Sequence, residues 1–199
     1  MMTDLQRLEL VTAPAALPVS LSEVKAQLRI EHSDEDTYLD RLIDVAVATV
    51  DAKGVLGQCV ITQTWAQWLP QTPNREITLQ LGPVQSVDAV KYYDTDGVLQ
   101  TDSLVNFDIF GLPFSKVIKP KTGFNWPVSQ VRPDSIKIEF TAGYGGTSAD
   151  VPDTIRHAML MLIAYWYENR ENELIGLNSK TLPFGFADLL NLHRERWYG

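Results

Sequence analysis

The most apolar stretch of the chain has helical character, begins at Val151 and continues to Glu171. Pro152 and Asp153 open it, and both residue types favour the first turn of a helix. Residues 158–167 follow and carry no charge on any face. A surface helix of a monomer has one apolar stripe and one polar face. We therefore expect this helix to be covered on two sides, on one side by its own chain and on the other by another copy of the chain. The expected contacts between copies are His157, Met161, Tyr165, Glu168 and Arg170.

Arg170 has a second interpretation, because a cation near the end of a helix also complements the helix dipole. His157 is expected to be a packed or interface histidine rather than a metal ligand, since it has no histidine or carboxylate partner at metal-binding spacing.

Two shorter helices are predicted before residue 57. Ser20 and Glu23 form a Ser-x-x-Glu capping box, whose side chains bond the free backbone N–H groups of a helix start. A second box is expected at residues 33–36, where consecutive carboxylates fit a first helical turn better than a metal site. The apolar face of the second helix is expected to consist of Tyr38, Leu39, Leu42, Ile43, Ala46 and Val50.

From Cys59 onward the apolar positions alternate with a period of two, which is typical of strands. Asp96 and Gly97 form a tight hairpin signal. The turn residues between the runs indicate a compact antiparallel sheet or a small sandwich. The expected strands cover residues 60–68, 77–81, 87–93, 107–110, 116–119 and 136–140, with a return strand that begins at 98–99.

These patterns predict an α+β fold, in which a helical part packs with a small antiparallel sheet or sandwich. We expect one domain over residues 1–199. Its parts are an N-terminal helical part at 1–57, a β part at 58–146, a long helix at 151–175 and a C-terminal extension at 176–199.

The chain is acidic, with a net charge of −8 over 199 residues and a pI near 4.8. An acidic surface repels phosphate, so sequence-independent binding to nucleic acid is disfavoured. The single cysteine, Cys59, excludes an internal disulfide and is expected to be a small hydrophobic strand residue. The sequence shows no signal peptide and no uncharged run long enough to span a bilayer, so we expect folding in a reducing cytoplasm and no membrane contact.

A search for catalytic motifs gives little. The glycines of residues 143–146 lack the lysine and hydroxyl of a phosphate-binding loop, and no serine lies in a Gly-x-Ser-x-Gly motif. We therefore expect no enzymatic activity, no metal and no cofactor. Lys116, Lys119 and Lys121 form the one local basic cluster, which is either a solvated hairpin or a loop that touches DNA phosphate or an acidic partner.

An ordered set of short segments resembles the head–tail connector, or adaptor, proteins of tailed bacteriophages and gene transfer agents. The resemblance extends over roughly residues 8–175. The segments that carry it are PVSLSEVKAQLR at 18–29, the acidic helix start at 34–36, QTW at 63–65, LGPV at 81–84 with Val87, YYD at 92–94 with Asp96 and Gly97, AGYG at 142–145, Val151 and Pro152 with Ile155 and Ala158, and YENRE at 167–171.

The resemblance implies a structural subunit that forms a ring, in the family usually of twelve copies, under the portal of a phage or phage-like particle. It implies a tail-side connector or stopper protein as the next neighbour, and a channel through which DNA slides without specific binding. It also implies location in the virion, at the head–tail interface, after assembly in the host cytoplasm. The alternatives are a tail-completion or baseplate binding module and, from another class, a small hydrolase with a carboxylate site.

The family's C-terminal segment reaches toward the portal, which assigns that role here to an aromatic and basic stretch after a polar linker at 176–180. Phenylalanine and tryptophan side chains would fill pockets, and arginines would pair with carboxylates at the rim. The alternative is that the segment folds back on its own domain as a last helix. The expected portal contacts are Phe184, Phe186, Leu189, Leu190, Leu192, Arg194, Arg196, Trp197 and Tyr198.

Overall fold

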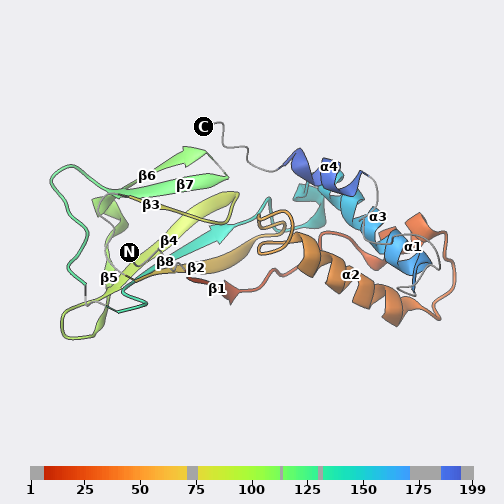
Figure 1. Ribbon diagram of the computed structural model, residues 1–199, viewed down its shortest axis with the longest axis horizontal. Helices are drawn as coiled ribbons and strands as arrows, with labels where there is room; N and C mark the ends of the chain where they lie inside the picture. Colours follow the sequence, from red (N-terminus) through yellow and green to blue (C-terminus); the bar gives the residue numbers. More distant parts are fainter. Residues whose placement is uncertain (1–6, 71–75, 113, 130–131, 171–184, 194–199) are drawn as a thin grey trace, which may run out of the picture. The chain divides into compact units, whose positions relative to one another are not determined.

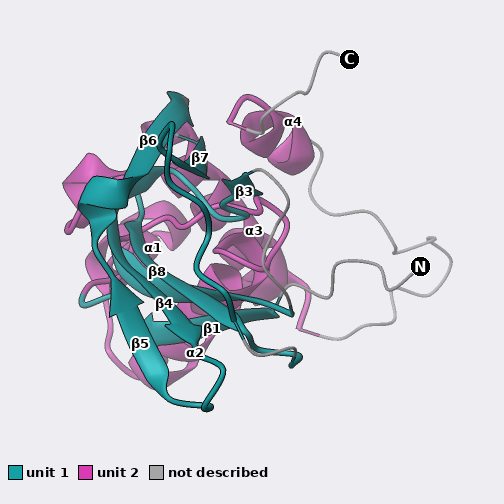
Figure 2. Cartoon of the chain, turned by 90° about the vertical axis from the view of Figure 1, so that its left-hand side faces the viewer, with its two compact units in different colours: residues 1–15, 62–143 teal, residues 16–61, 144–199 magenta. Residues whose placement is uncertain are grey.

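The computed structural model describes residues 7–70, 76–112, 114–129, 132–170 and 185–193 (Figure 1). The chain divides into two compact units (Figure 2). Unit 1 comprises residues 1–15 and 62–143, and unit 2 comprises residues 16–61 and 144–199. Unit 1 contains the sheets and unit 2 the helices, which confirms the predicted α+β class.

Unit 1 contains two antiparallel sheets. The larger has five strands in the order β1-β2-β8-β4-β5, and the smaller has three in the order β3-β7-β6. The strands are β1 (Arg7–Thr12), β2 (Gln63–Leu69), β3 (Ile77–Thr78), β4 (Val84–Tyr93), β5 (Leu99–Asp102), β6 (Phe107–Leu112), β7 (Ser115–Pro120) and β8 (Ile136–Ala142), with a short 3-10 turn, η1 (Leu104–Asn106), before β6.

The predicted alternation is clearest in β8, the middle strand of the larger sheet. Ile136, Ile138 and Phe140 are buried, whereas Lys137 and Glu139 between them are partly exposed. Successive side chains of a strand point to opposite faces, so β8 has one face in the core and one toward water. The predicted hairpin is also present: β4 pairs with β5, and Gly97 has a positive φ of 79° in the turn between them.

A buried glutamine connects the two sheets of unit 1. Gln67 of β2 has no exposed surface. Its amide nitrogen donates to the backbone oxygen of Thr78 in β3 at 2.9 Å, and its amide oxygen accepts from the backbone nitrogen of Gln80 at 3.0 Å. A buried amide is costly unless its hydrogen bonds are made, so these bonds favour one register between the sheets.

Unit 2 contains four helices, within the residues that the structure describes: α1 (Leu21–Leu28), α2 (Asp36–Val50), α3 (Asp153–Glu168) and α4 (Phe186–Asn191). A 3-10 turn, η2 (Ser148–Asp150), precedes α3. The helices share one apolar core. Its helical members are Val24 of α1, Leu39, Leu42, Ile43, Ala46 and Val50 of α2, Ile155, Ala158, Met159, Leu162 and Ile163 of α3, and Phe186 and Leu190 of α4.

The capping box of α1 is confirmed. Ser20 is the N-cap, its hydroxyl accepts from the backbone nitrogen of Glu23 at 3.3 Å, and Glu23 accepts from the backbone nitrogen of Ser20 at 2.8 Å. The second box is wrong, because α2 begins after Glu35, which makes no side-chain cap, and Ser33 contributes only its carbonyl to the turn. The apolar face predicted for α2 is confirmed.

The strand β1 was not expected from the sequence. Arg7, Leu8, Glu9 and Leu10 alternate polar and apolar positions, but the run is short and lies ahead of two helices. The strand nevertheless pairs with β2, so the N-terminal end of the chain belongs to the sheet unit. None of the helices that the structure describes is long and apolar enough to be a transmembrane candidate.

Candidate assembly surfaces

The helix α3 has two unlike sides. Ile155, Met159 and Leu162 lie in the core of unit 2. His157, Met161 and Tyr165, which are four residues apart along the helix, lie outside that core, with His157 exposed and the other two half-buried. Residues at this spacing share one face of a helix. Unit 2 therefore covers one side of α3 completely and leaves an apolar side, bordered by the exposed Glu168, only partly covered.

Arg170 is engaged within its own chain. Its Nη2 lies 2.5 Å from Oε1 of Glu35, which directly precedes α2. Its guanidinium carbon lies 4.7 Å from the ring centres of both Tyr38 and Tyr167. The hydroxyl of Tyr167 donates to the other oxygen of Glu35. These hydrogen bonds, from Tyr167 first and Arg170 second, hold the pKa of Glu35 below its ordinary value.

Arg170 already has an ion-pair partner within its own chain. Contact with a neighbouring copy through Arg170, or interaction with the dipole of its own helix, stays a prediction. In the structure its described ion pair is with Glu35 of the same chain. The side chain thus fastens the end of α3 to the start of α2, and the open side of α3 is represented by His157, Met161, Tyr165 and Glu168.

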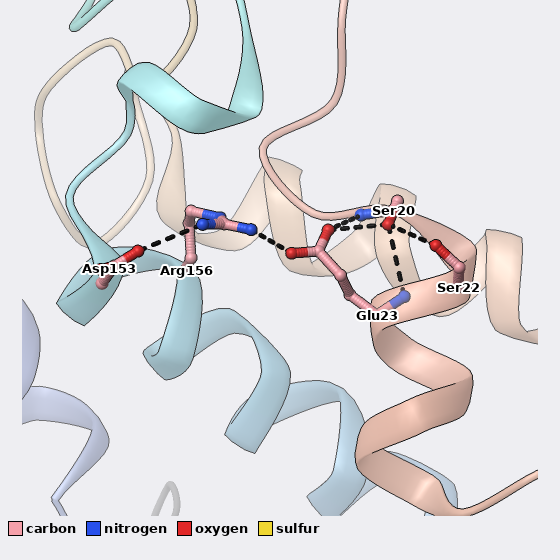
Figure 3. Close-up of polar contacts among 5 residues, drawn as sticks. All are labelled: Ser20, Ser22, Glu23, Asp153 and Arg156. Carbon is pink, nitrogen blue, oxygen red and sulfur yellow. Dashed lines mark hydrogen bonds and ion pairs between the residues drawn. The ribbon is translucent and has the colours of Figure 1, made fainter.

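A second ion pair fastens the other end of α3 (Figure 3). Arg156 pairs with Oε1 of Glu23 in α1, and its Nη1 lies 3.1 Å from Oδ1 of Asp153. The second oxygen of Glu23 accepts from the hydroxyl of Ser20 at 2.7 Å, and that hydroxyl lies 3.0 Å from the hydroxyl of Ser22. Burial raises the pKa of Glu23, but the hydrogen bonds from Ser20 and the charge of Arg156 outweigh it, so the pKa is lowered.

The local sequence predicts only half of this Arg156 cluster. Ser20 and Glu23 form a recognisable capping box, whereas Arg156 has no local signal. Its carboxylate partner lies 133 residues away in sequence, so only the packing of α1 on α3 brings the two together.

The C-terminal helix α4 contributes to the core of unit 2. Phe186 and Leu190 are 0% and 1% exposed, and Leu189 packs against the same core. Portal contact through Phe186 and Leu190 is therefore incompatible with this fold, because an amphipathic helix here buries its apolar stripe in its own unit. Leu192, at 71% exposed, remains accessible. The other expected portal contacts, Phe184, Arg194, Arg196, Trp197 and Tyr198, lie outside the described residues.

Polar contacts hold α4 in place after its last turn. The side-chain nitrogen of Gln58 donates to the backbone oxygen of His193 at 2.5 Å, and the hydroxyl of Tyr144 donates to the side-chain oxygen of Gln58 at 2.8 Å. Nε2 of His193 lies 2.5 Å from the hydroxyl of Thr154 in α3. Burial lowers the pKa of His193 and raises the pKa of Tyr144 to about 12, so both side chains favour their neutral forms.

The three lysines of the expected basic loop do not share one face. Lys116 and Lys119 lie an odd number of residues apart on β7, so their side chains point to opposite faces of the sheet. Lys116 donates to the backbone oxygen of Gln85 at 3.3 Å, and Lys119 lies opposite Asp108 of β6 in the strand register. Lys121 is exposed just after the strand. This arrangement favours a solvated hairpin over a phosphate-binding patch.

The residues that the structure describes contain no group of three or more histidine, cysteine or acidic side chains placed to hold a metal ion. Cys59 has no exposed surface.

The comparisons with known proteins agree with the resemblance drawn from the sequence. Residues 18–106, slightly less than half of the chain, match the family of phage gp6-like head-tail connector proteins. This match confirms the resemblance to head–tail connectors. No curated protein matches the chain at a significant level.

Solved structures of gene transfer agent (GTA) particles share the fold. A chain in the neck of an empty GTA particle, computed with C6 symmetry, is 22% identical with a TM-score of 0.77, over 97% of this chain and 98% of that chain. A chain in the virion of a native GTA particle has the same identity and TM-score, over 96% and 98%. A chain in the neck of a native GTA particle, computed with C12 symmetry, is 22% identical with a TM-score of 0.66, over 97% and 98%.

Proposed function

We propose that the chain is a structural adaptor subunit that forms a ring at the head–tail interface of a phage or phage-like particle. The observation that carries the proposal is the match of residues 18–106 to the head-tail connector family. The likeness of nearly the whole chain to chains in GTA necks supports it, and the C6 and C12 symmetries of those necks favour a ring, for which we propose twelve copies. The work of such a subunit is assembly, and it requires no catalytic group.

The open side of α3 is the proposed contact between neighbouring copies. Met161 and Tyr165 are apolar or aromatic and only half-buried, and His157 and Glu168 extend this side at both ends. Aromatic and methionine side chains are enriched in protein interfaces. In a cyclic ring each copy uses two different surfaces, so this side of α3 would meet another surface of the neighbouring copy.

Native mass spectrometry tests the ring. We expect rings from the purified chain, and loss of rings in Met161→Glu and Tyr165→Glu, because burying an unpaired carboxylate at a contact costs several kcal/mol or more. Val45→Glu is the matched control, since Val45 is 51% exposed on the outer side of α2. A monomeric wild-type chain, or rings that persist in both α3 variants with their fold intact, would contradict this contact.

The proposed partners are the portal protein on the head side and a connector or stopper protein on the tail side. Portal contact is proposed for Leu192 together with Arg194, Arg196, Trp197 and Tyr198, and DNA would pass through the ring without specific binding. The net charge of −8 supports that passage, because an acidic lining repels the phosphate backbone. Location in the particle follows from these contacts, with assembly in the host cytoplasm.

A chain that ends at His193 tests the portal contact and leaves α4 complete. We expect it to fold and form rings but to lose attachment to portal-containing heads. A matched variant, Phe186→Ala, removes a core side chain and should instead lower the free energy of unfolding by about 3–5 kcal/mol. Normal attachment of the shortened chain would show that residues 194–199 do not contribute to the contact.

A further inference from the structure

The helix α4 is held in the core of unit 2 by few groups. It has six residues, of which Phe186 and Leu190 are buried. A helix this short is not stable in water by itself, so α4 keeps its fold only while it is docked beside α3 (Figure 1). A change in a group that fastens its end therefore shifts the balance between docked and released α4.

His193 is the residue that fastens this end. Its backbone oxygen accepts from the side chain of the buried Gln58, and its ring meets the ring of Tyr144 edge-on, with 6.3 Å between the ring centres. Its Nε2 lies 2.5 Å from the hydroxyl of Thr154 in α3. The half-buried imidazole thus lies among an amide, a hydroxyl and a phenol, and the phenol stays neutral because the pKa of Tyr144 is raised to about 12.

The elements around His193 give a cation there no paired carboxylate, within the residues that the structure describes. The only histidine ion pair in that part of the chain is the one between His32 and Asp34. The titratable groups on the elements near His193 have partners of their own or lie exposed: Arg156 pairs with Asp153 and Glu23, Asp150 with Thr147, and Asp51 with the backbone of Val60, whereas Lys53, His157 and Asp188 are exposed.

A proton on His193 therefore adds a charge without a counterpart. Thr154 can accept as well as donate, so its bond with Nε2 survives protonation, and the cost comes from the charge itself. The positive end of α3 and the negative end of α4 both lie near the ring, and their effects on a cation oppose one another. Burial then decides the sign, because it disfavours the charged imidazole and lowers the pKa of His193 below its ordinary 6.5.

We propose that α4 is a pH-sensitive latch: a proton on His193 releases α4 from the core of unit 2 while α1, α2 and α3 stay folded. This inference goes beyond the proposed function and does not depend on the ring. A released imidazole takes up its proton near pH 6.5, whereas the docked imidazole resists it. Docking is therefore strongest above that pH and weakens as the pH falls below it.

Hydrogen exchange of residues 186–193 in the full chain tests the latch. Protection factors correct for the ordinary effect of pH on exchange, and we compare them at about pH 7.5 and pH 5.5. A released imidazole is about nine-tenths protonated at pH 5.5, which weakens docking by up to about tenfold. We expect the protection factors of α4 to fall by at least about threefold while those of α2 stay unchanged. A smaller fall in α4, or an equal fall in α2, would overturn the latch.

Three variants assign the effect to the imidazole. His193→Gln has no charge to gain, so the protection of α4 should no longer depend on pH. His32→Gln is the matched control, since His32 is exposed ahead of α2 and its loss should leave the wild-type fall intact. Thr154→Asp places a carboxylate beside Nε2 and should reverse the effect, with α4 better protected at the lower pH.

The Thr154→Asp variant keeps the test decisive if His193→Gln loosens α4 at both pH values. Far-UV circular dichroism of each variant shows whether the other helices remain folded. A fall in protection that Thr154→Asp leaves unchanged, or one that persists in His193→Gln, would overturn the proposal.

Discussion

Two ion-pair clusters fasten opposite ends of α3 to the N-terminal helices of unit 2, and they use the same charges in different surroundings. In the Arg156 cluster the arginine and Glu23 side chains are 23% and 31% exposed. In the Arg170 cluster the arginine is 49% exposed and Glu35 is 25% exposed. The comparison indicates that the Arg156 cluster contributes more to the stability of unit 2 than the Arg170 cluster, because an ion pair that is accessible to water contributes little.

The two clusters also differ in what holds the carboxylate. Glu23 is fixed by the capping box of its own helix before it meets Arg156. Glu35 makes no cap on α2, and its cluster is organised by the rings of Tyr38 and Tyr167 around Arg170. The Arg156 cluster therefore couples a helix start to packing, whereas the Arg170 cluster combines an exposed ion pair with cation–π contacts.

The largest loss of stability is expected for Arg156→Ala. The substitution leaves Glu23 partly buried without its cation, so we expect the free energy of unfolding to fall by about 1–3 kcal/mol. The orphaned, buried Nε of Arg156, which has no hydrogen-bond partner, offsets part of the benefit of the native pair. Urea denaturation measures the change, and Glu23→Gln should reproduce most of it. A loss below about 0.5 kcal/mol would place this pair with ordinary surface contacts.

The next largest loss of stability is expected at the start of α1, and no comparable loss at the start of α2. Ser20→Ala removes a confirmed N-cap and should lower the free energy of unfolding by about 1 kcal/mol. Ser33→Ala is the matched control, because the Ser33 carbonyl, which the substitution keeps, accepts the turn bond near the start of α2. We expect it to stay within about 0.5 kcal/mol of the wild type. Equal losses in the two variants would contradict the assignment of one cap and not the other.

These helix starts show how far the sequence predicts the fold. The apolar face of α2, the capping box of α1 and the strand pattern around the Asp96-Gly97 turn depend on neighbours close in sequence, and each is confirmed. The box at Ser33 has the same composition as a true cap, but α2 begins at Asp36 and its N-cap residue, Glu35, makes no side-chain cap. Composition alone does not distinguish the two cases.

The candidate surfaces were harder to predict, because they depend on which side chains the fold has already used. The sequence identified α3 as too apolar for a free surface helix, and the structure leaves Met161 and Tyr165 half-buried. It did not separate Phe186 and Leu190 from the rest of the apolar C-terminal segment. An amphipathic stripe indicates that one side of a helix is buried, but it does not indicate whether the same chain or another protein covers that side.

A smaller effect is expected at the Arg170 cluster. Arg170→Ala should lower the melting temperature less than Arg156→Ala, because its ion pair is more exposed and is screened by salt. Arg170→Lys keeps the charge but loses the guanidinium contacts with the rings of Tyr38 and Tyr167, and should resemble the alanine variant. Differential scanning calorimetry of the variants side by side measures the order. A larger loss at Arg170 than at Arg156 would show that the aromatic contacts outweigh burial of the ion pair.

The smallest expected effect is the pH dependence that the two glutamates share. The pKa values of Glu23 and Glu35 both lie below the ordinary 4.5 in the folded chain. The unfolded chain therefore takes up these protons first as the pH falls, so the stabilisation is complete above about pH 4.5 and is lost as the pH drops through the folded pKa values. We expect unfolding free energies measured from roughly pH 6 to pH 3 to decline less steeply in Glu23→Gln and in Glu35→Gln than in the wild type. The pKa of Glu23 is lowered by its contacts with Ser20 and Arg156, and the pKa of Glu35 by its contacts with Tyr167 and Arg170. If neither variant changes the decline of the unfolding free energy with pH, other carboxylates control the acid response of unit 2.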